Sequence, residues 1–257
     1  MNIKWNTEKY ESNFSFVHEY GEDLFNLITA PKGSFAVDLG CGNGALTEAL
    51  QNEGYNVLGI DASQDMITTA KELHPNIEFS LQDVTDFKLD KKADVIFSNA
   101  VFHWINEDKQ PKTVQNISDN LNEGGMLVCE FGGFGNCEAI QRAVENAFKS
   151  RNLKYIREWY FPTIAQYTAL LEKAGMQTVY ASLFDRLTEQ KGENGVEEWM
   201  RMFLKTPFEG LADNQKNEII AEAVNSLKPI LYKNGKWFAD YVRIRIKAVK
   251  KSKINYA

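Results

Sequence analysis

The sequence is poor in cysteine, proline and histidine. Its 257 residues include three cysteines, six prolines and three histidines. Cys41, Cys129 and Cys137 match no spacing that is typical of a zinc site or a redox pair. This excludes a disulfide framework, and we expect no metal site and a reduced, cytoplasmic compartment.

Long apolar runs and excess positive charge are also missing. No apolar stretch approaches the roughly 20 residues that a membrane helix needs, and the N-terminus lacks the apolar core of a signal peptide. The 29 basic and 35 acidic side chains give a net charge of -6, which favours neither nucleic acid nor an anionic membrane as partner. With no repeat or linker either, we expect one globular domain, a monomer or homodimer, acting on a small-molecule substrate.

Three glycines near residue 40 follow a short apolar run and precede a helical pattern. Residues 35–39 predict a buried strand, Gly40, Gly42 and Gly44 a tight loop, and residues 45–50 the start of a helix. Glycine allows the backbone to turn sharply and to lie against a ligand, because it carries no Cβ. A loop of this kind at a helix N-terminus indicates a nucleotide site.

The nature of the nucleotide depends on Asp38. Gly40, Gly42 and Ala45 also satisfy the loose dinucleotide fingerprint, which leaves NAD open. A carboxylate at position 38 suits a cationic ligand better than a pyrophosphate. Asp38 and the three glycines fill the pattern acid-x-Gly-x-Gly-x-Gly, and the stretch resembles the first motif of class I S-adenosylmethionine-dependent methyltransferases. The resemblance implies S-adenosyl-L-methionine as cofactor, with S-adenosyl-L-homocysteine as product.

Two further acids follow the next predicted strands. Asp61 directly follows the predicted strand 57–60 and comes about 20 residues after Gly40. At this position of a nucleotide-binding unit, a carboxylate accepts hydrogen bonds from ribose hydroxyls. Asp83 follows the strand 77–81 and resembles the adenine-binding acid of the family, with Val84 donating its amide; Asp86 competes for this role. The predicted cofactor site also includes their neighbours Cys41, Ala62, Met66 and Gln82.

The exit of the predicted strand 94–99 is expected to line the same cleft, because ligands bind beyond the carboxyl ends of parallel strands. Its sequence, Ser-Asn-Ala-x-x-His-Trp, resembles the corresponding stretch of small-molecule methyltransferases of the trans-aconitate and malonyl-carrier-protein types. The resemblance puts Asn99 and Ala100 at the methionine end of the cofactor, and His103 and Trp104 towards the substrate. His103 is the candidate catalytic base, with a purely positioning hydrogen bond as the alternative. Trp159 is a further candidate for the acceptor pocket.

Alternating strand and helix patterns predict a doubly wound α/β fold. The resemblance implies a mostly parallel seven-stranded sheet of order 3-2-1-4-5-7-6 with the last strand antiparallel. We expect an N-terminal cap over 1–30, a cofactor-binding core over 34–135, and helical lid insertions over 136–162 and 188–236. In the final strand, 237–249, Arg243, Arg245 and Lys247 alternate with apolar residues and predict one solvent-facing side.

The resemblance implies in-line transfer of a methyl group, for which alignment and exclusion of water supply much of the catalysis. A carboxylate acceptor needs no base, whereas a hydroxyl, amine or carbon acid must lose a proton. Two other classes stay open. An NAD-dependent oxidoreductase would use the same glycine loop and Asp61, and a non-catalytic protein would bind S-adenosylmethionine without transferring its methyl group.

Overall fold

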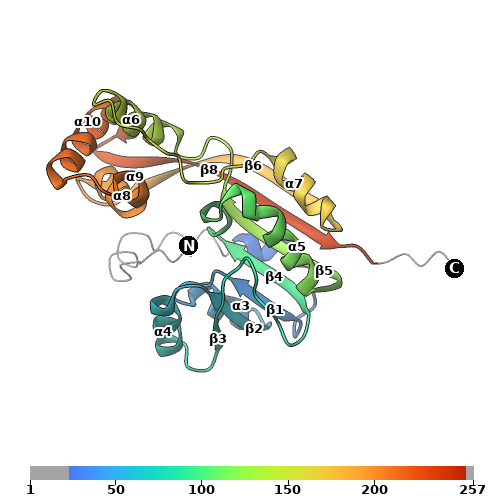
Figure 1. Cartoon of the computed structure of the whole chain (residues 1–257). Helices are drawn as coiled ribbons and strands as arrows, with labels where there is room; N and C mark the ends of the chain where they lie inside the picture. Colours follow the sequence, from blue (N-terminus) through green and yellow to red (C-terminus); the bar gives the residue numbers. More distant parts are fainter. Residues whose placement is uncertain (1–22, 253–257) are drawn as a thin grey trace.

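The structure, a computed structural model of the chain, describes residues 23–252 (Figure 1). Eight strands form one sheet: β1 (Phe35–Leu39), β2 (Asn56–Asp61), β3 (Glu78–Leu81), β4 (Ala93–Asn99), β5 (Leu121–Gly132), β6 (Met176–Gln190), β7 (Tyr232–Lys233) and β8 (Lys236–Lys250). Their order is β3-β2-β1-β4-β5-β8-β6, and β7 pairs only with β8. Strands β1 to β5 are parallel, and β8 runs antiparallel to both β5 and β6. The predicted fold and strand order are confirmed, with the two-residue β7 as an addition.

The helices follow the strands in alternation. They are η1 (Asp23–Leu27), α3 (Ala45–Asn52), α4 (Gln64–Leu73), η2 (Phe102–Trp104), η3 (Glu107–Lys109), α5 (Gln110–Asn120), α6 (Glu138–Lys149), α7 (Ile164–Lys173), α8 (Gly195–Phe203), α9 (Lys205–Phe208) and α10 (Asp213–Leu231). Local signals set several ends, as where Ser63 accepts a hydrogen bond from the amide of Met66 at the start of α4. Within residues 23–252, every helix is too short or too polar to cross a bilayer.

Successive side chains of β4 enter two different cores. Ile96 packs in the cluster that contains Tyr167 of α7, whereas Val95 and Phe97 pack with Leu50 of α3. This alternation is the period of a strand covered on both faces, and each fully buried side chain of this size stabilises the fold by about 1.5–3 kcal/mol. The parallel sheet is therefore a rigid layer whose loops present side chains at one edge.

Beyond this layer, β6 and β8 continue as a two-stranded ribbon (Figure 1). β8 pairs with β5 only from Arg243 to Val249, but with β6 from Trp237 to Lys250. Helices α6, α8, α9 and α10 gather at the far end of the ribbon. Their apolar side chains form a separate core with Trp237, Ala239 and Tyr241 of β8. We call these four helices with the adjoining ribbon the helical lobe.

Two regions predicted from the sequence, 1–30 and 188–236, do not coincide with elements of the structure. Most of the predicted N-terminal cap, 1–30, lies outside the described residues. The part that the structure describes contains η1, a 3-10 helix in which Leu24 is buried. The predicted insertion 188–236 overlaps the sheet, because Thr188 and Gln190 belong to β6 and Lys236 begins β8. Thr188 and Gln190 are polar yet buried, so hydrophobicity did not mark them as strand residues.

Candidate functional site

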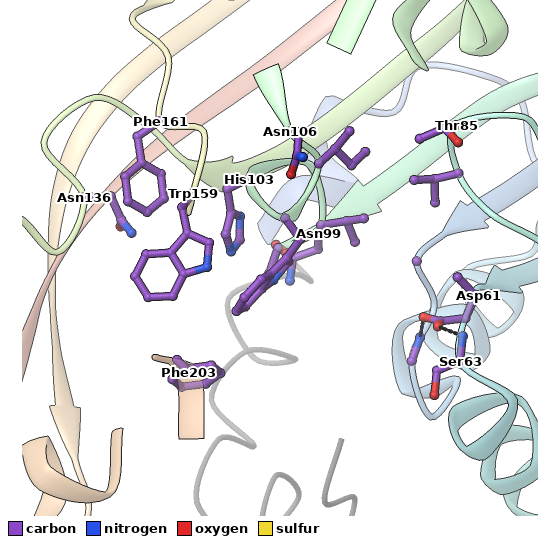
Figure 2. A pocket seen from close by; sticks show the side chains of 18 of the residues that line it. Asp61, Ser63, Thr85, Asn99, His103, Asn106, Asn136, Trp159, Phe161 and Phe203 are labelled. Carbon is purple, nitrogen blue, oxygen red and sulfur yellow. Dashed lines mark hydrogen bonds between the residues drawn. The ribbon is translucent and has the colours of Figure 1, made fainter. Parts of the chain in front are cut away.

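A cavity of about 470 Å³ lies between the loop edge of the parallel sheet and the helical lobe. One end is lined by the loops after β1, β2 and β3, the middle by the exit of β4, and the other end by aromatic side chains of the lobe and of the segment before α7. Figure 2 shows Asp61 and Ser63 at the first end and Trp159, Phe161 and Phe203 at the other. The volume is in the range of small-molecule and cofactor sites.

The glycine loop adopts a backbone that other residues rarely reach. Gly40, Gly42 and Gly44 have φ of +82°, +56° and +87°. A Cβ on Gly40 would lie 2.2 Å from a methyl carbon of Val101, whereas a Cβ on Gly42 would meet no atom within 4 Å. Gly42 lines the cavity, so its bare backbone leaves space in which a ligand can lie against the chain.

Asp38 lies behind this loop and does not line the cavity. It is 2% exposed, and its Oδ2 accepts a hydrogen bond of 2.7 Å from the hydroxyl of Thr47 in α3. Burial raises the pKa of Asp38 to about 7; the bond from Thr47 opposes this and the charge of Asp61 adds to it. The side chain thus links β1 to the helix that the glycine loop opens.

Asp61 joins the ends of β1 and β2. Its Oδ2 accepts from the amide of Gly42 at 3.0 Å, and its Oδ1 accepts from the amide of Ser63 at 2.8 Å (Figure 2). Burial raises the pKa of Asp61, and the hydrogen bonds from these amides counteract the rise. The carboxylate is thereby fixed in the cavity wall, where its remaining lone pairs can accept from a ligand.

Asp83, at the end of β3, faces the cavity with Val84 and Thr85. Burial alone would raise its pKa, but hydrogen bonds from the amide and hydroxyl of Thr85, at 2.9 and 2.8 Å, leave it lowered. Both bonds use Oδ1 and leave Oδ2 outside them. Asp86, its competitor in the sequence, is exposed and does not line the cavity.

The exit of β4 carries backbone strain next to the glycine loop. Ala100 has φ +60°, a left-handed conformation that costs a residue with a Cβ about 1–3 kcal/mol and that clusters at functional sites. A hydrogen bond of 2.7 Å from its amide to the carbonyl of Glu130 holds it there. Asn99 and Ala100 both line the cavity, and Val101 packs against Gly40.

His103 reaches the middle of the cavity from η2 and is 7% exposed. Its Nδ1 accepts a hydrogen bond of 3.3 Å from the amide of Gly132. Burial, together with the charge of Arg243, lowers the pKa of His103 well below its usual value. An imidazole that is neutral and accepts at Nδ1 carries its proton on Nε2, so its free nitrogen is a hydrogen-bond donor and not a base.

Beyond His103 the cavity becomes an aromatic chamber, formed by Trp104, Trp159, Phe161, Trp199, Phe203 and Tyr241. Their rings pack at centroid distances of 5.2 to 6.4 Å, for example 5.5 Å between Trp104 and Trp159. The indole nitrogen of Trp159 is buried without a hydrogen-bond partner in the part of the chain that the structure describes. Trp159 and His103 both pack against the ring of Phe161, at centroid distances of 5.8 and 6.0 Å.

Most of the site residues expected from the sequence meet in this one cavity. Those that line it are Gly40, Gly42, Asp61, Ala62, Met66, Asp83, Val84, Asn99, Ala100, His103, Trp104 and Trp159. Asp38, Cys41, Gly44 and Gln82 are not among its lining residues. Phe161, from the same aromatic group as Trp159, also lines it, and so do four residues to which sequence reasoning assigned no site role: Trp199, Phe203, Tyr241 and Arg243.

Comparison with known proteins finds relatives, one of which matches nearly the whole chain. The sequence model of a methyltransferase domain matches residues 36–125. An uncharacterized methyltransferase of Schizosaccharomyces pombe is 31% identical over 259 residues, which covers 96% of this chain and 98% of the relative. Trans-aconitate 2-methyltransferase of Agrobacterium fabrum is 31% identical over 130 residues, half of each chain. Among solved structures, an N-methyltransferase of Haemonchus contortus with S-adenosylhomocysteine has a TM-score of 0.59 at 16% identity, over 96% of this chain and 57% of that one.

Proposed function

This chain belongs to the S-adenosylmethionine-dependent methyltransferases, and we propose that it transfers the methyl group to a small-molecule acceptor bound in the aromatic chamber. The observation that carries the proposal is the continuity of the cavity, in which the glycine loop and the chamber are two ends of one space. The family decides against the NAD-dependent oxidoreductase that the glycine loop alone left open.

The first end of the cavity fits the cofactor. The open space at Gly42 and the fixed carboxylate of Asp61 support a ribose lying against the loop, with its hydroxyls donating to Asp61. The free Oδ2 of Asp83 and the backbone of Val84 suit the amino group and ring of adenine. We assign Ala62 and Met66 to the same end, because they line it. Asp38, Cys41, Gly44 and Gln82 act there by holding the loops in shape.

Asn99 and Ala100 lie between this end and His103, and we assign to them the methionine part of the cofactor. When bound, S-adenosylmethionine supplies a methyl group on a sulfonium, which needs no activation by the protein. The strained backbone of Ala100 fixes this part of the wall, and His103 follows directly. The chain's contribution is to align the acceptor and exclude water, which removes much of the barrier of a bimolecular reaction.

The chemistry of His103 favours an acceptor that is already a nucleophile. A neutral imidazole that donates from Nε2 can orient an oxygen but cannot take a proton from it. A carboxylate attacks through an oxygen lone pair without losing a proton, so we propose a carboxylate as the methyl acceptor.

Calorimetric titration with S-adenosylmethionine, S-adenosylhomocysteine and NAD tests the cofactor assignment, and Asp86 provides a matched control. We expect the two sulfur compounds to bind and NAD not to bind. Asp83→Ala should weaken binding of S-adenosylhomocysteine about tenfold or more, which corresponds to at least one lost hydrogen bond. Asp86→Ala should leave the affinity unchanged, since that side chain is outside the cavity.

Labelled methyl donor, offered with a panel of small carboxylic acids, phenols and amines, tests the transfer itself. The expected result is a labelled methyl ester from at least one acid. Labelled phenol ethers or methylamines in place of esters would contradict the carboxylate. Tight cofactor binding with no labelled product from any compound would favour the non-catalytic binding protein and overturn the proposal.

A further inference from the structure

Arg243 of β8 is a cation in the cavity wall without a counter-ion. It is 8% exposed and lines the cavity between Tyr241 and His103. Over residues 23–252, no carboxylate forms an ion pair with it and no acceptor takes a hydrogen bond from its guanidinium. A buried charge of this kind is costly unless an ion or a ligand pairs with it.

The acids that lie close to Arg243 on the sheet are engaged elsewhere. Glu130 of β5 is shared by Arg186 and Arg245, with Arg245 Nη2 at 2.7 Å from its Oε2. Asp240 of β8 accepts a hydrogen bond of 2.6 Å at its Oδ2 from the amide of Ala139 at the start of α6, whereas its Oδ1 is buried without a hydrogen-bond partner among the described residues and forms no ion pair with Arg243. The fold thus supplies partners for the other arginines of this region and leaves Arg243 to whatever enters the cavity.

The guanidinium of Arg243 is held in place before any ligand arrives. Its central carbon lies 4.4 Å from the centroid of the Tyr241 ring, a cation–π contact that fixes its position. One further donor faces the same chamber, the buried indole nitrogen of Trp159, which has no partner among the described residues. A guanidinium and an indole N–H around apolar rings suit an anionic group carried on a flat apolar body.

This anion site is displaced from the point of methyl transfer. Asn99 pairs with Glu130 of β5, and Gly132 of β5 pairs with Arg243, so two strand spacings separate Asn99 from Arg243. Between the two backbones, that separation is about 10 Å across the sheet. A carboxylate clamped by a guanidinium also has its lone pairs engaged in charge-assisted bonds, which makes it a poor nucleophile. The group that Arg243 holds is therefore a different one from the group that is methylated.

We propose that Arg243 is a specificity-determining residue that anchors a second, unmethylated acidic group of a flat acceptor in the aromatic chamber. The inference rests on the proposed function, since it assumes that the acceptor binds there. It identifies the substrate class as molecules with two acidic groups, one held by Arg243 and the other directed towards Asn99 and His103.

The test compares flat diacids with their monoamides, which differ only in one charge. Isophthalate, terephthalate and glutaconate serve as diacids, and methyl ester formation and binding to the S-adenosylhomocysteine complex are measured. We expect kcat/KM for the preferred diacid to exceed that for its monoamide by about 30-fold or more, the cost typical of an unpaired buried charge. Arg243→Gln should remove this preference, and Arg243→Lys should retain part of it.

Arg142→Gln is the matched control, because Arg142 is an exposed arginine of the helical lobe paired with Glu138. It should leave both the preference and the affinity for S-adenosylhomocysteine unchanged, and Arg243→Gln should leave that affinity unchanged too. Equal turnover of diacids and monoamides, a preference that survives in Arg243→Gln, or a complex that binds none of the diacids would overturn the inference. Methylation restricted to uncharged or monoacid compounds would overturn it and leave the proposed methyl transfer intact, whereas no methylation of any acid would count against the proposed function itself.

Discussion

The replacement Gly42→Ala separates folding from ligand binding, because the structure gives this position a left-handed backbone, which is strained only for a residue with a Cβ, and empty surroundings. Gly42 has φ +56°, and an added Cβ would meet no protein atom within 4 Å. Alanine in the left-handed region costs about 1–2 kcal/mol of stability. A methyl group in a space that a ligand fills costs about 1–3 kcal/mol of overpacking, which is roughly 5- to 150-fold in affinity.

Gly124→Ala carries the same backbone cost away from the cavity. Gly124 has φ +77°, and a Cβ there would also meet no atom within 4 Å. Urea unfolding should therefore give similar losses of stability for the two variants, while calorimetry with S-adenosylhomocysteine should give weaker binding for Gly42→Ala alone. Wild-type affinity in Gly42→Ala, or equal loss of affinity in both variants, would refute the placement of the cofactor against the loop.

Three further predictions concern buried polar groups. The pKa of Asp38 is raised from 3.8 to about 7, so the stability gained from its proton is complete below about pH 4 and is lost as the pH rises to 7. The melting temperature of Asp38→Asn should therefore rise relative to that of the wild type between pH 4 and pH 7. A difference in melting temperature that stays constant over this interval would contradict the prediction. His103→Gln keeps a donor near Nε2 and should retain kcat within about tenfold, whereas loss of a general base would cost about 10²- to 10⁴-fold. Glu130→Gln leaves two largely buried arginines, Arg186 and Arg245, without a full counter-charge and should cost about 3–5 kcal/mol in urea unfolding.

Exposed and buried acids give the contrast that the last of these predictions needs. Glu138 pairs with Arg142 and Arg157 at the surface of the helical lobe. Glu138→Gln should cost no more than about 1 kcal/mol, because exposed ion pairs are screened by water. Comparable losses for Glu130→Gln and Glu138→Gln would mean that burial of the ion pair is not what sets its contribution.

The end of the cavity to which we assign the cofactor could be predicted as a cluster of residues, because these residues are close together in the sequence. The glycines, Asp61 and Asp83 each follow a short apolar strand, and parallel strands bring their carboxyl ends to one edge. What the sequence could not tell is which atoms face the ligand. Asp38 belongs to the motif, yet it points to Thr47 behind the loop, and that depends on how α3 packs.

The aromatic chamber could be predicted only in part, because it is assembled from distant segments: Trp104 and Trp159 were expected there, whereas Trp199, Phe203 and Tyr241 were not. Trp159, Trp199 and Tyr241 are far apart in the sequence and meet because the ribbon of β6 and β8 carries the lobe next to the segment before α7. Alternation predicted a solvent-facing side for Arg243 and Arg245, and this prediction was wrong. Arg243 is enclosed by the cavity and Arg245 by the ion pair with Glu130, since the lobe covers the end of the strand that would otherwise face water.

This division between near and distant residues has a consequence for specificity. The stretch that matches the methyltransferase domain, residues 36–125, contains the glycine loop, Asp61 and Asp83, whereas Trp159, Trp199 and Arg243 lie outside it. Backbone geometry constrains the first group tightly, because Gly40 cannot gain a Cβ without displacing Val101. Trp104 lies within the matched stretch, but the chamber side chains on the lobe and before α7 are constrained by the packing of the lobe, so they can be exchanged without disturbing the loop. Under the proposed function, the choice of acceptor depends on these side chains, and exchanging the aromatic residues of the lobe should change which molecule is methylated while the affinity for S-adenosylhomocysteine stays the same.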